Sequence, residues 1–408
     1  MSAPIVIIGA SHGGVQLAAS LRQLGCEDKI ILYSAEDVLP YHRPPLSKAF
    51  LSGEKDLDQI LLRGPAFYED HGIDLRLSDP VTSIDLTTRR LAARSGVQDF
   101  SRLILATGSK ARELKAPGSD LQNIFTLRSL GDVLRLKQAM LDAQDIVIIG
   151  GGFIGLEFAS TAAKLGKTVT VIEAREKLLM RALPASVGDF LRDYHAGHNV
   201  QFHFNANFAE FEGADGKLQA IRLADGTRIK ADMSLVGIGG EADLALLAPL
   251  GLNMIAGGIE VDEFGRTSIE DVYALGDVAA SANMLAAEPM RLESVQNAVD
   301  QAKAVAAHML GQDAPAPVVP WFWTDQYDLK VQMAGLSRPG AVQTIRGDVE
   351  GNAFSVLETV DGRLVALFSI NRAADHMAAR RLIAEGAPLD MNLAADASVP
   401  LMKAVAKP

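Results

Sequence analysis

The sequence predicts an α/β fold with two parallel βαβ units and a small α+β region at the C-terminal end. The first observation is a repeat, because residues 5–14 and 146–155 are both apolar strands that run into a glycine-rich turn. Each turn is followed by a helical stretch and a second apolar strand, at 30–33 and 169–173. This order is a βαβ crossover, which makes its two strands parallel. The second observation is an alternating apolar pattern at 329–333, which is typical of a half-buried strand.

Length and charge limit the possible functions. A chain of 408 residues that is 48% hydrophobic and 22% charged can form several buried cores. Its net charge of −11 argues against a nucleic-acid binder, which needs a basic face. Cys26 is the only cysteine, so one chain can hold neither a disulfide nor a cysteine-pair redox centre. The sequence suggests no metal site, signal peptide or membrane span, and we expect a cytoplasmic protein.

The remaining segments predict further elements. Residues 103–108 are an apolar strand that ends in Thr-Gly, and 271–277 are a strand that runs into a turn. Asp-Gly pairs at 215–216 and 225–226 predict a hairpin meander, which we expect to end at 235–239. After this come a helix at 296–310, a linker with three prolines at 311–320, a hairpin at 361–362 and a helix at 373–385.

The second glycine motif, Gly150-x-Gly152-x-x-Gly155, lies between a strand and a helix. Its glycines permit a tight turn, close approach of a pyrophosphate and close packing of helix on strand. Glu173 ends the next strand, where an acid holds the ribose hydroxyls of NAD. We therefore expect an NADH site. Arg175 points the other way, since an arginine there could pair with the 2′-phosphate of NADPH.

The first glycine motif is degenerate. It reads Gly9-x-Ser11-x-x-Gly14, with a serine in place of the second glycine and with Gly13 beside it. A decayed structural repeat that binds nothing is the alternative.

The loop that follows contains two prolines, which fix an extended backbone from which Arg43 and Lys48 project. By itself this pattern also fits a rigid surface loop with solvated charges. In chain order, however, the loop and several later segments match one family. The sequence resembles FAD-dependent NADH:ferredoxin reductases of bacterial cytochrome P-450 and ring-hydroxylating dioxygenase systems, of the putidaredoxin reductase type. The matching segments are residues 40–41, 43–48, 106–108, 157, 276–277, 293–297 and 320–323.

The resemblance implies two Rossmann-like, glutathione-reductase-like domains for FAD and NAD, followed by a small α+β domain. We expect the FAD domain at 1–110 and 240–318, the NAD domain at 111–239 and the C-terminal domain at 319–408.

The resemblance also implies the residues that contact FAD. Ala35 stands where the family has a ribose-binding acid, and Glu36 could replace it by a one-residue shift. Trp321 and Trp323 could instead be core packing, with Trp323 the better candidate for the flavin. The expected FAD contacts are Gly9, Ser11, Gly13, Gly14, Ala35, Glu36, Arg43, Lys48, Val81, Thr107, Gly108, Arg128, Gly276, Asp277, Val295 and Trp323. The expected NAD contacts are Gly150, Gly152, Phe153, Ile154, Gly155, Glu173 and Gly239.

Lys48 and Glu157 are the expected catalytic residues. A lysine beside the flavin stabilises negative charge as hydride arrives, and a buried lysine needs a partner such as Glu157. The alternative is an exposed lysine and a helix-cap glutamate.

The expected function is transfer of electrons from NADH through FAD to a [2Fe–2S] ferredoxin that feeds an oxygenase. A disulfide reductase fails, because it requires a cysteine pair. A flavoprotein like apoptosis-inducing factor, with a redox-sensing or partner-binding role, is the alternative. Because such ferredoxins are acidic, we expect a local basic docking area. The C-terminal region from Trp321 has nine basic and ten acidic residues, and its candidate contacts are Arg338, Arg372, Arg380 and Arg381.

Overall fold

The computed structural model describes residues 3–283, 285–286 and 288–406 and divides the chain into two compact units. Unit 1 consists of Met1–His42, Leu57–Lys110 and Glu241–Pro320. Unit 2 consists of Arg43–Asp56, Ala111–Gly240 and Trp321–Pro408. The loop with Arg43 and Lys48 is thus part of unit 2. The three-domain division expected from the sequence stays a prediction.

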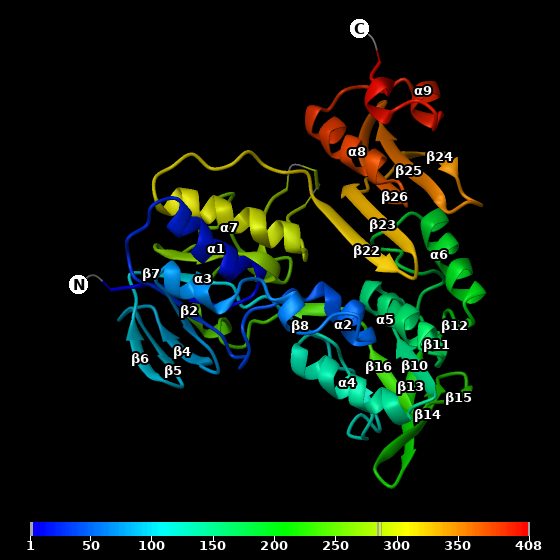
Figure 1. The fold of residues 1–408 in the computed structure, drawn as a ribbon, viewed down its shortest axis with the longest axis horizontal. Helices are drawn as coiled ribbons and strands as arrows, with labels where there is room; N and C mark the ends of the chain where they lie inside the picture. Colours follow the sequence, from blue (N-terminus) through cyan, green and yellow to red (C-terminus); the bar gives the residue numbers. More distant parts are fainter. Residues whose placement is uncertain (1–2, 284, 287, 407–408) are drawn as a thin grey trace. The chain divides into compact units, whose positions relative to one another are not determined.

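Unit 1 is built on a five-stranded parallel sheet with the order β20-β7-β1-β2-β3. These strands are Val272–Ala274, Arg102–Leu105, Ile5–Ile8, Ile30–Tyr33 and Ile73–Arg76. All four residues of β1 are buried, as expected for a strand covered on both faces. Helices α1 (His12–Gln23) and α7 (Val295–Met309) pack against each other (Figure 1). The predicted βαβ crossover is therefore present, because β1 and β2 pair in parallel and α1 connects them in the sequence.

Smaller elements complete unit 1. One antiparallel sheet contains β4, β5 and β6, and a second small sheet contains β18, β19 and β21. Their bounds are Val81–Asp85, Arg90–Ala93, Gly96–Asp99, Met254–Ile255, Gly258–Glu260 and Ala279–Ala280. Helix α3 covers Pro65–Asp70, and the short 3-10 helices η2, η3 and η4 cover Asp58–Ile60, Ala248–Leu250 and Gly276–Val278.

Unit 2 contains the second parallel sheet, with the order β12-β11-β10-β16-β9. These strands are Val200–His203, Thr168–Ile172, Asp145–Ile149, Met233–Val236 and Ile124–Phe125. The helices are α4 (Leu130–Asp142), α5 (Phe153–Lys164) and α6 (Ala185–Gly197). The short segments η1 (Pro44–Ser47) and α2 (Ala49–Ser52) belong to the same unit.

The predicted meander is partly wrong. Strands β13 (Phe208–Ala214), β14 (Lys217–Leu223) and β15 (Arg228–Lys230) form it, with turns at the two Asp-Gly pairs. The strand expected to end the meander, β16, instead pairs in parallel with β10. All four residues of β16 are buried, so it belongs in the centre of a covered sheet rather than at the edge of a hairpin.

The C-terminal part of unit 2 is an antiparallel sheet with the order β22-β23-β26-β25-β24. These strands are Trp321–Gln326, Leu329–Gly335, Arg363–Ile370, Ala353–Val360 and Val342–Asp348. Helix α8 (Ala373–Glu385) lies along this sheet, and α9 (Met391–Ala395) and η5 (Leu401–Ala404) follow (Figure 1). Apolar residues of β23, β25 and β26 share one core with Leu156 of α5 and Leu191 of α6. The predicted α+β fold of this region is confirmed.

The remaining short strands are β8 (Ser109–Ala111) and β17 (Gly240–Ala242). Among the described residues, no helix combines the length and the apolar character needed to cross a bilayer. No group of three side chains suited to hold a metal ion occurs in the same part of the chain.

Candidate functional site: two dinucleotide turns and a buried ion pair

The first glycine turn connects β1 to α1 in unit 1. Gly9 has φ +114°, and a Cβ there would lie 2.1 Å from the carbonyl oxygen of Ala106. A Cβ on Gly14 would lie 2.0 Å from the carbonyl oxygen of Gly9. Both positions therefore require glycine, one for the turn and one for close packing of helix on strand. The structure thus explains the first and last glycines of this motif without any ligand.

The second turn repeats this geometry in unit 2. Gly150 has φ +106°, and its Cβ would lie 2.5 Å from the carbonyl oxygen of Gly237. A Cβ on Gly155 would lie 2.3 Å from the carbonyl oxygen of Gly150. Gly152 differs, because its nearest such atom is 3.8 Å away and its φ is −83°. Neither packing nor backbone conformation requires glycine at 152, so the free space there suits a phosphate group against the start of α5.

Ser11 occupies the corresponding position in the first turn, since each residue immediately precedes its helix. It has an extended backbone, with φ −116°, that any residue can adopt. The neighbouring Gly13 faces the side chain of Leu275, and a Cβ there would lie 2.4 Å from its Cδ1. The serine therefore fits the turn without backbone strain, and the helix start still offers its N–H groups to an anion.

Ala35 and Glu36 follow β2. Ala35 is exposed and its methyl side chain has no polar atom, so it cannot bind a ribose hydroxyl through its side chain. The Glu36 carboxylate is partly buried and accepts a hydrogen bond of 2.5 Å from the Tyr41 hydroxyl. Glu36 directly follows Ala35 in the sequence, and its carboxylate is oriented by Tyr41.

Glu173 follows β11 and faces the second turn. One carboxylate oxygen accepts a 2.8 Å hydrogen bond from the Gly151 N–H, and the other accepts one of 2.9 Å from the Arg175 N–H. These two contacts fix the carboxylate at the carboxyl end of the strand, as a ribose-binding acid requires. Arg175 contributes its backbone to this arrangement.

Asp277 lies in η4, directly after β20. Its carboxylate accepts a 2.8 Å hydrogen bond from the Ser109 hydroxyl, and its carbonyl accepts one of 2.7 Å from Arg291. The preceding Gly276 has φ +74° and donates its N–H to Gln301 of α7 at 2.7 Å. The predicted Gly-Asp turn is therefore held on both sides.

Thr107 and Gly108 follow β7 in the same unit. The Thr107 hydroxyl donates to the carbonyl of Asp243 at 3.1 Å, and the Gly108 carbonyl accepts the Asp243 N–H at 3.1 Å.

Lys48 and Glu157 form an ion pair inside unit 2. The Lys48 Nζ lies 2.7 Å from Glu157 Oε1, and their side chains are 16% and 7% exposed. The other carboxylate oxygen accepts a 2.5 Å hydrogen bond from Ser47, and Oε1 also accepts one of 2.6 Å from Thr324. The carboxylate therefore has three donors, which compensates for much of the cost of burying its charge.

Arg43 and Arg128 lie together in unit 2. The Arg43 guanidinium donates to the carbonyl of Arg128 at 2.7 Å. The N–H groups of Arg128 and Ser129 both donate to the Asp132 carboxylate, which forms the capping box of α4 together with Ser129. The loop and the start of α4 are thereby joined.

The remaining predicted residues have these positions. Trp323 is partly buried in β22, with its ring 5.5 Å from that of Trp321. Phe153 opens α5 and packs on Phe322 at 4.8 Å, and Ile154 beside it is 43% exposed. Val81 opens β4, Val295 opens α7, and Gly239 is exposed with φ +97°.

The expected basic docking residues are not equivalent. Arg372 donates to Asp375 at 2.6 Å, and Asp375 is also bound by the buried Arg346 at 3.0 Å. Arg372 therefore serves an internal network. Arg380 lies over the Trp321 ring at 5.0 Å, and the exposed Arg381 pairs with Glu385.

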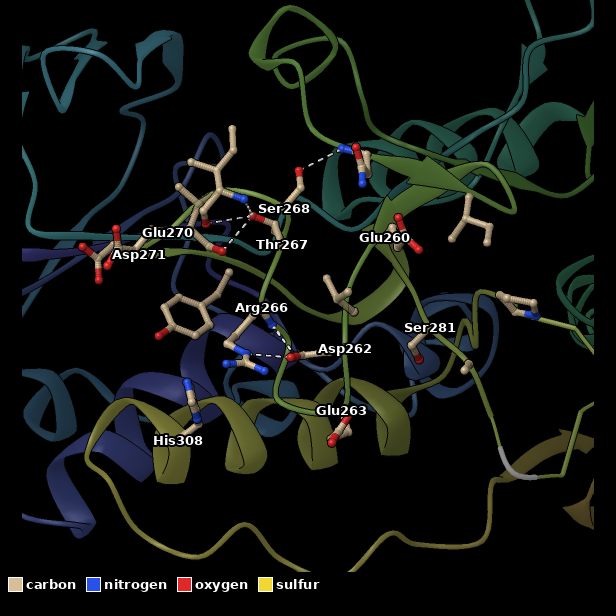
Figure 2. A pocket seen from close by; sticks show the side chains of 18 residues that line it. Glu260, Asp262, Glu263, Arg266, Thr267, Ser268, Glu270, Asp271, Ser281 and His308 are labelled. Carbon is tan, nitrogen blue, oxygen red and sulfur yellow. Dashed lines mark hydrogen bonds and ion pairs between the residues drawn. The ribbon is translucent and has the colours of Figure 1, made fainter.

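A separate pocket of about 830 Å³ lies in unit 1, between Asn253 and His308 (Figure 2). Figure 2 shows Asp262 and Arg266 pointing toward each other, with an ion pair of 2.6 Å. No predicted cofactor residue lines this pocket. Its walls carry five carboxylates and only one arginine, Arg266. The excess negative charge would repel the phosphates of a dinucleotide. The acidic residues are Glu260, Asp262, Glu263, Glu270 and Asp271.

Sequence reasoning missed three partners in these sites: Ser47 and Thr324 on Glu157, and Ser109 on Asp277. Ser47 and Thr324 are each adjacent in sequence to a predicted residue, Lys48 and Trp323. Adjacency alone did not indicate that their hydroxyls face a carboxylate 110 and 167 positions away.

Two strand–turn–helix units of matching geometry, with an acid at the second, define an oxidoreductase with two dinucleotide sites. Residues 3–302 match the family described as pyridine nucleotide-disulphide oxidoreductase, and residues 321–405 match the reductase C-terminal domain. The chain belongs to the pyridine nucleotide-disulphide oxidoreductase family.

The chain is 40% identical to the 5,5′-dehydrodivanillate O-demethylase ferredoxin reductase subunit of Sphingobium sp. over 98% of both chains. It is 39% identical to rhodocoxin reductase of Rhodococcus erythropolis, over 99% of this chain and 94% of that protein. A crystal structure of the covalent putidaredoxin reductase–putidaredoxin complex superposes with a TM-score of 0.94 at 33% identity, covering 98% of both chains. These matches confirm the predicted fold and the predicted class, an FAD- and NAD(P)H-dependent ferredoxin reductase.

Proposed function

We propose that this chain takes reducing equivalents from NADH and passes them singly, through FAD, to a [2Fe–2S] ferredoxin that supplies an oxygenase. The observation that carries this proposal is the pair of glycine turns with the same internal geometry, one after β1 and one after β10. Two such turns in one chain provide for two dinucleotides. When bound, FAD accepts hydride from a nicotinamide and releases electrons one at a time.

In this proposal the Gly9–Gly14 turn (residues 9–14), Gly276 and Asp277 hold FAD in unit 1, with Val81, Thr107, Gly108 and Val295. Glu36 takes the ribose contact that Ala35 lacks, because its carboxylate is fixed by Tyr41. Arg43, Arg128 and Trp323 are the other proposed FAD contacts.

The proposed NADH site is the second turn, Gly150, Gly152 and Gly155, with Phe153, Ile154 and Gly239 at its rim. Glu173 selects the nucleotide, because its fixed carboxylate accepts from ribose hydroxyls and repels a 2′-phosphate. That selection favours NADH over NADPH.

Lys48 supplies positive charge where negative charge develops during hydride transfer, and Glu157 holds it in place. The proposed domain division is 1–110 with 240–318 for FAD, 111–239 for NAD and 319–408 for the C-terminal domain. A cytoplasmic location belongs to the same proposal, and cell fractionation tests it.

The experiment is direct. The purified protein, supplied with FAD, should be yellow, and NADH should bleach it without oxygen. Adding candidate [2Fe–2S] ferredoxins should then support cytochrome c reduction. A protein that stays colourless with FAD would overturn the proposal. A protein that is reduced by NADH but by no ferredoxin would favour the redox-sensing alternative.

A further inference from the structure

A chain of hydrogen bonds leads from Glu157 into the interior of unit 2. The Thr324 hydroxyl lies 2.6 Å from Glu157 Oε1, and Gln326 Nε2 lies 3.2 Å from the Thr324 hydroxyl. Gln326 Oε1 then lies 2.8 Å from His195 Nε2. Thr324, Gln326 and His195 are each 0% exposed. These hydrogen bonds join β22 to helices α5 and α6, which lie in different parts of the sequence.

The direction of this chain follows from its first member. An ionised carboxylate only accepts, so the Thr324 hydroxyl gives its single proton to Glu157 and accepts from Gln326. Only the amide nitrogen of Gln326 can donate, so its carbonyl oxygen faces His195. The Nε2 of His195 must therefore carry a proton, and this fixes the neutral ring in one tautomer.

The far end of the chain agrees with this direction. Burial lowers the pKa of His195 to about 4, so the imidazole is neutral at pH 7 and its Nδ1 is an acceptor. The Tyr327 hydroxyl lies 3.5 Å from that Nδ1, and the two rings meet edge-on at 5.0 Å. Every donor from Tyr327 onward thus points toward Glu157.

We propose that Thr324, Gln326 and His195 are positioning residues, which orient the Glu157 carboxylate and thereby hold the Lys48 ammonium for hydride transfer. Glu157 Oε1 accepts from Lys48 and Thr324 together, so the threonine fixes the oxygen that anchors the lysine. A lysine on four rotatable bonds needs such an anchor to occupy one position. This inference rests on the proposed function of Lys48.

Thr324→Val tests the proposal, because valine keeps the shape and removes the hydroxyl. In stopped-flow reduction of the FAD-loaded protein by NADH, it should slow the rate about 10- to 100-fold, as expected for loss of a hydrogen bond to a charge. The Kd for NADH should stay within twofold. Thr324→Ser, which restores the hydroxyl, should return the rate to within about threefold of wild type.

The matched control is Thr359→Val. Thr359 is also a buried strand threonine of the C-terminal sheet, but its hydroxyl faces the carbonyl of Val342. It should leave the rate unchanged. Equal slowing by Thr359→Val, or an unchanged rate in Thr324→Val, would overturn the proposal. If NADH fails to reduce the wild type at all, the proposed function itself fails.

A second measurement has a readout other than activity. Nitrogen-15 NMR of the histidine rings in the wild-type holoenzyme should show His195 protonated at Nε2 and not at Nδ1. In Thr324→Val that preference should weaken, because Gln326 can then turn over. Protonation of wild-type His195 at Nδ1 would break the direction of the chain and with it the inference.

Discussion

The carboxylate of Glu173 accepts the N–H of Gly151 at 2.8 Å, so the acid proposed to select the nucleotide is tied to the turn proposed to bind its phosphates. Loss of a hydrogen bond to a charge and added repulsion of a 2′-phosphate together amount to about 2–4 kcal/mol. We therefore expect kcat/KM for NADH to exceed that for NADPH by about 30- to 1000-fold. Equal values would mean that Arg175 decides the site.

Glu173→Gln should narrow that preference to less than about tenfold, because it removes the charge and keeps an acceptor oxygen. The measurement is kcat/KM for both nucleotides. Glu176→Gln, at an exposed acid three residues later, is the control and should change neither value. An undiminished preference in Glu173→Gln would assign selectivity to another residue.

Substitution by alanine should mainly affect stability at Gly155 and mainly affect NADH binding at Gly152. A Cβ at 155 would lie 2.3 Å from the carbonyl oxygen of Gly150, so Gly155→Ala should lower the free energy of unfolding by about 1–3 kcal/mol. At 152 the nearest such atom is 3.8 Å away, so Gly152→Ala should cost less than about 1 kcal/mol. It should nevertheless weaken NADH binding about tenfold or more, because the methyl group occupies phosphate space. Denaturation and NADH titration separate the two effects.

Lys48→Met should slow flavin reduction about 100-fold with little change in NADH affinity, because its charge acts as negative charge develops. It should also lower the free energy of unfolding by about 3 kcal/mol, since Glu157 stays buried without its cation. Stopped-flow reduction and denaturation test these effects. Lys55→Met, at an exposed lysine that follows α2 in the same unit, should show neither effect, and unchanged reduction in Lys48→Met would make Lys48 structural.

Stability should fall in mild acid. Burial lowers the pKa of His195 to about 4, below its ordinary value of 6.5, so the unfolded chain binds a proton more readily. Titration of His195 therefore leaves the free energy of unfolding unchanged above pH 6.5. As the pH drops toward 4, this residue lowers the free energy of unfolding by up to about 3 kcal/mol. His376 adds a second contribution of the same sign, because burial also lowers its pKa to about 4. Denaturation from pH 7 to pH 4 should show a smaller loss in His195→Gln than in wild type, while His71→Gln, at an exposed histidine of unit 1, should match wild type.

Docking of the ferredoxin should depend on salt. If local basic residues attract an acidic partner, ferredoxin-dependent turnover should fall steeply from low to moderate salt, while NADH–ferricyanide turnover barely changes. Arg380→Ala should weaken the salt dependence. A parallel response of the two activities would remove the case for charge-steered docking.

Local features of the sequence determined much of the fold. The helix predicted at 373–385 is α8, and both glycine turns follow the predicted strands. Gly9 and Gly150 are recognisable because a positive φ between a strand and a helix leaves almost no other choice of residue. Lys48 and Glu157 were both marked by the family resemblance, and they were paired in the prediction because a buried ammonium needs an anion.

Only the tertiary structure decided which distant groups meet. Strand β16 is apolar enough to be a hairpin strand, but in the structure it is buried and pairs in parallel with β10. Arg372 was predicted as a docking arginine, but its side chain pairs with Asp375, which the buried Arg346 also binds. Thr324 and Gln326 likewise have no local pattern that points to Glu157 or His195. Periodicity and backbone preference act over a few residues, whereas a hydrogen bond across more than 100 positions is selected by the packing of whole elements.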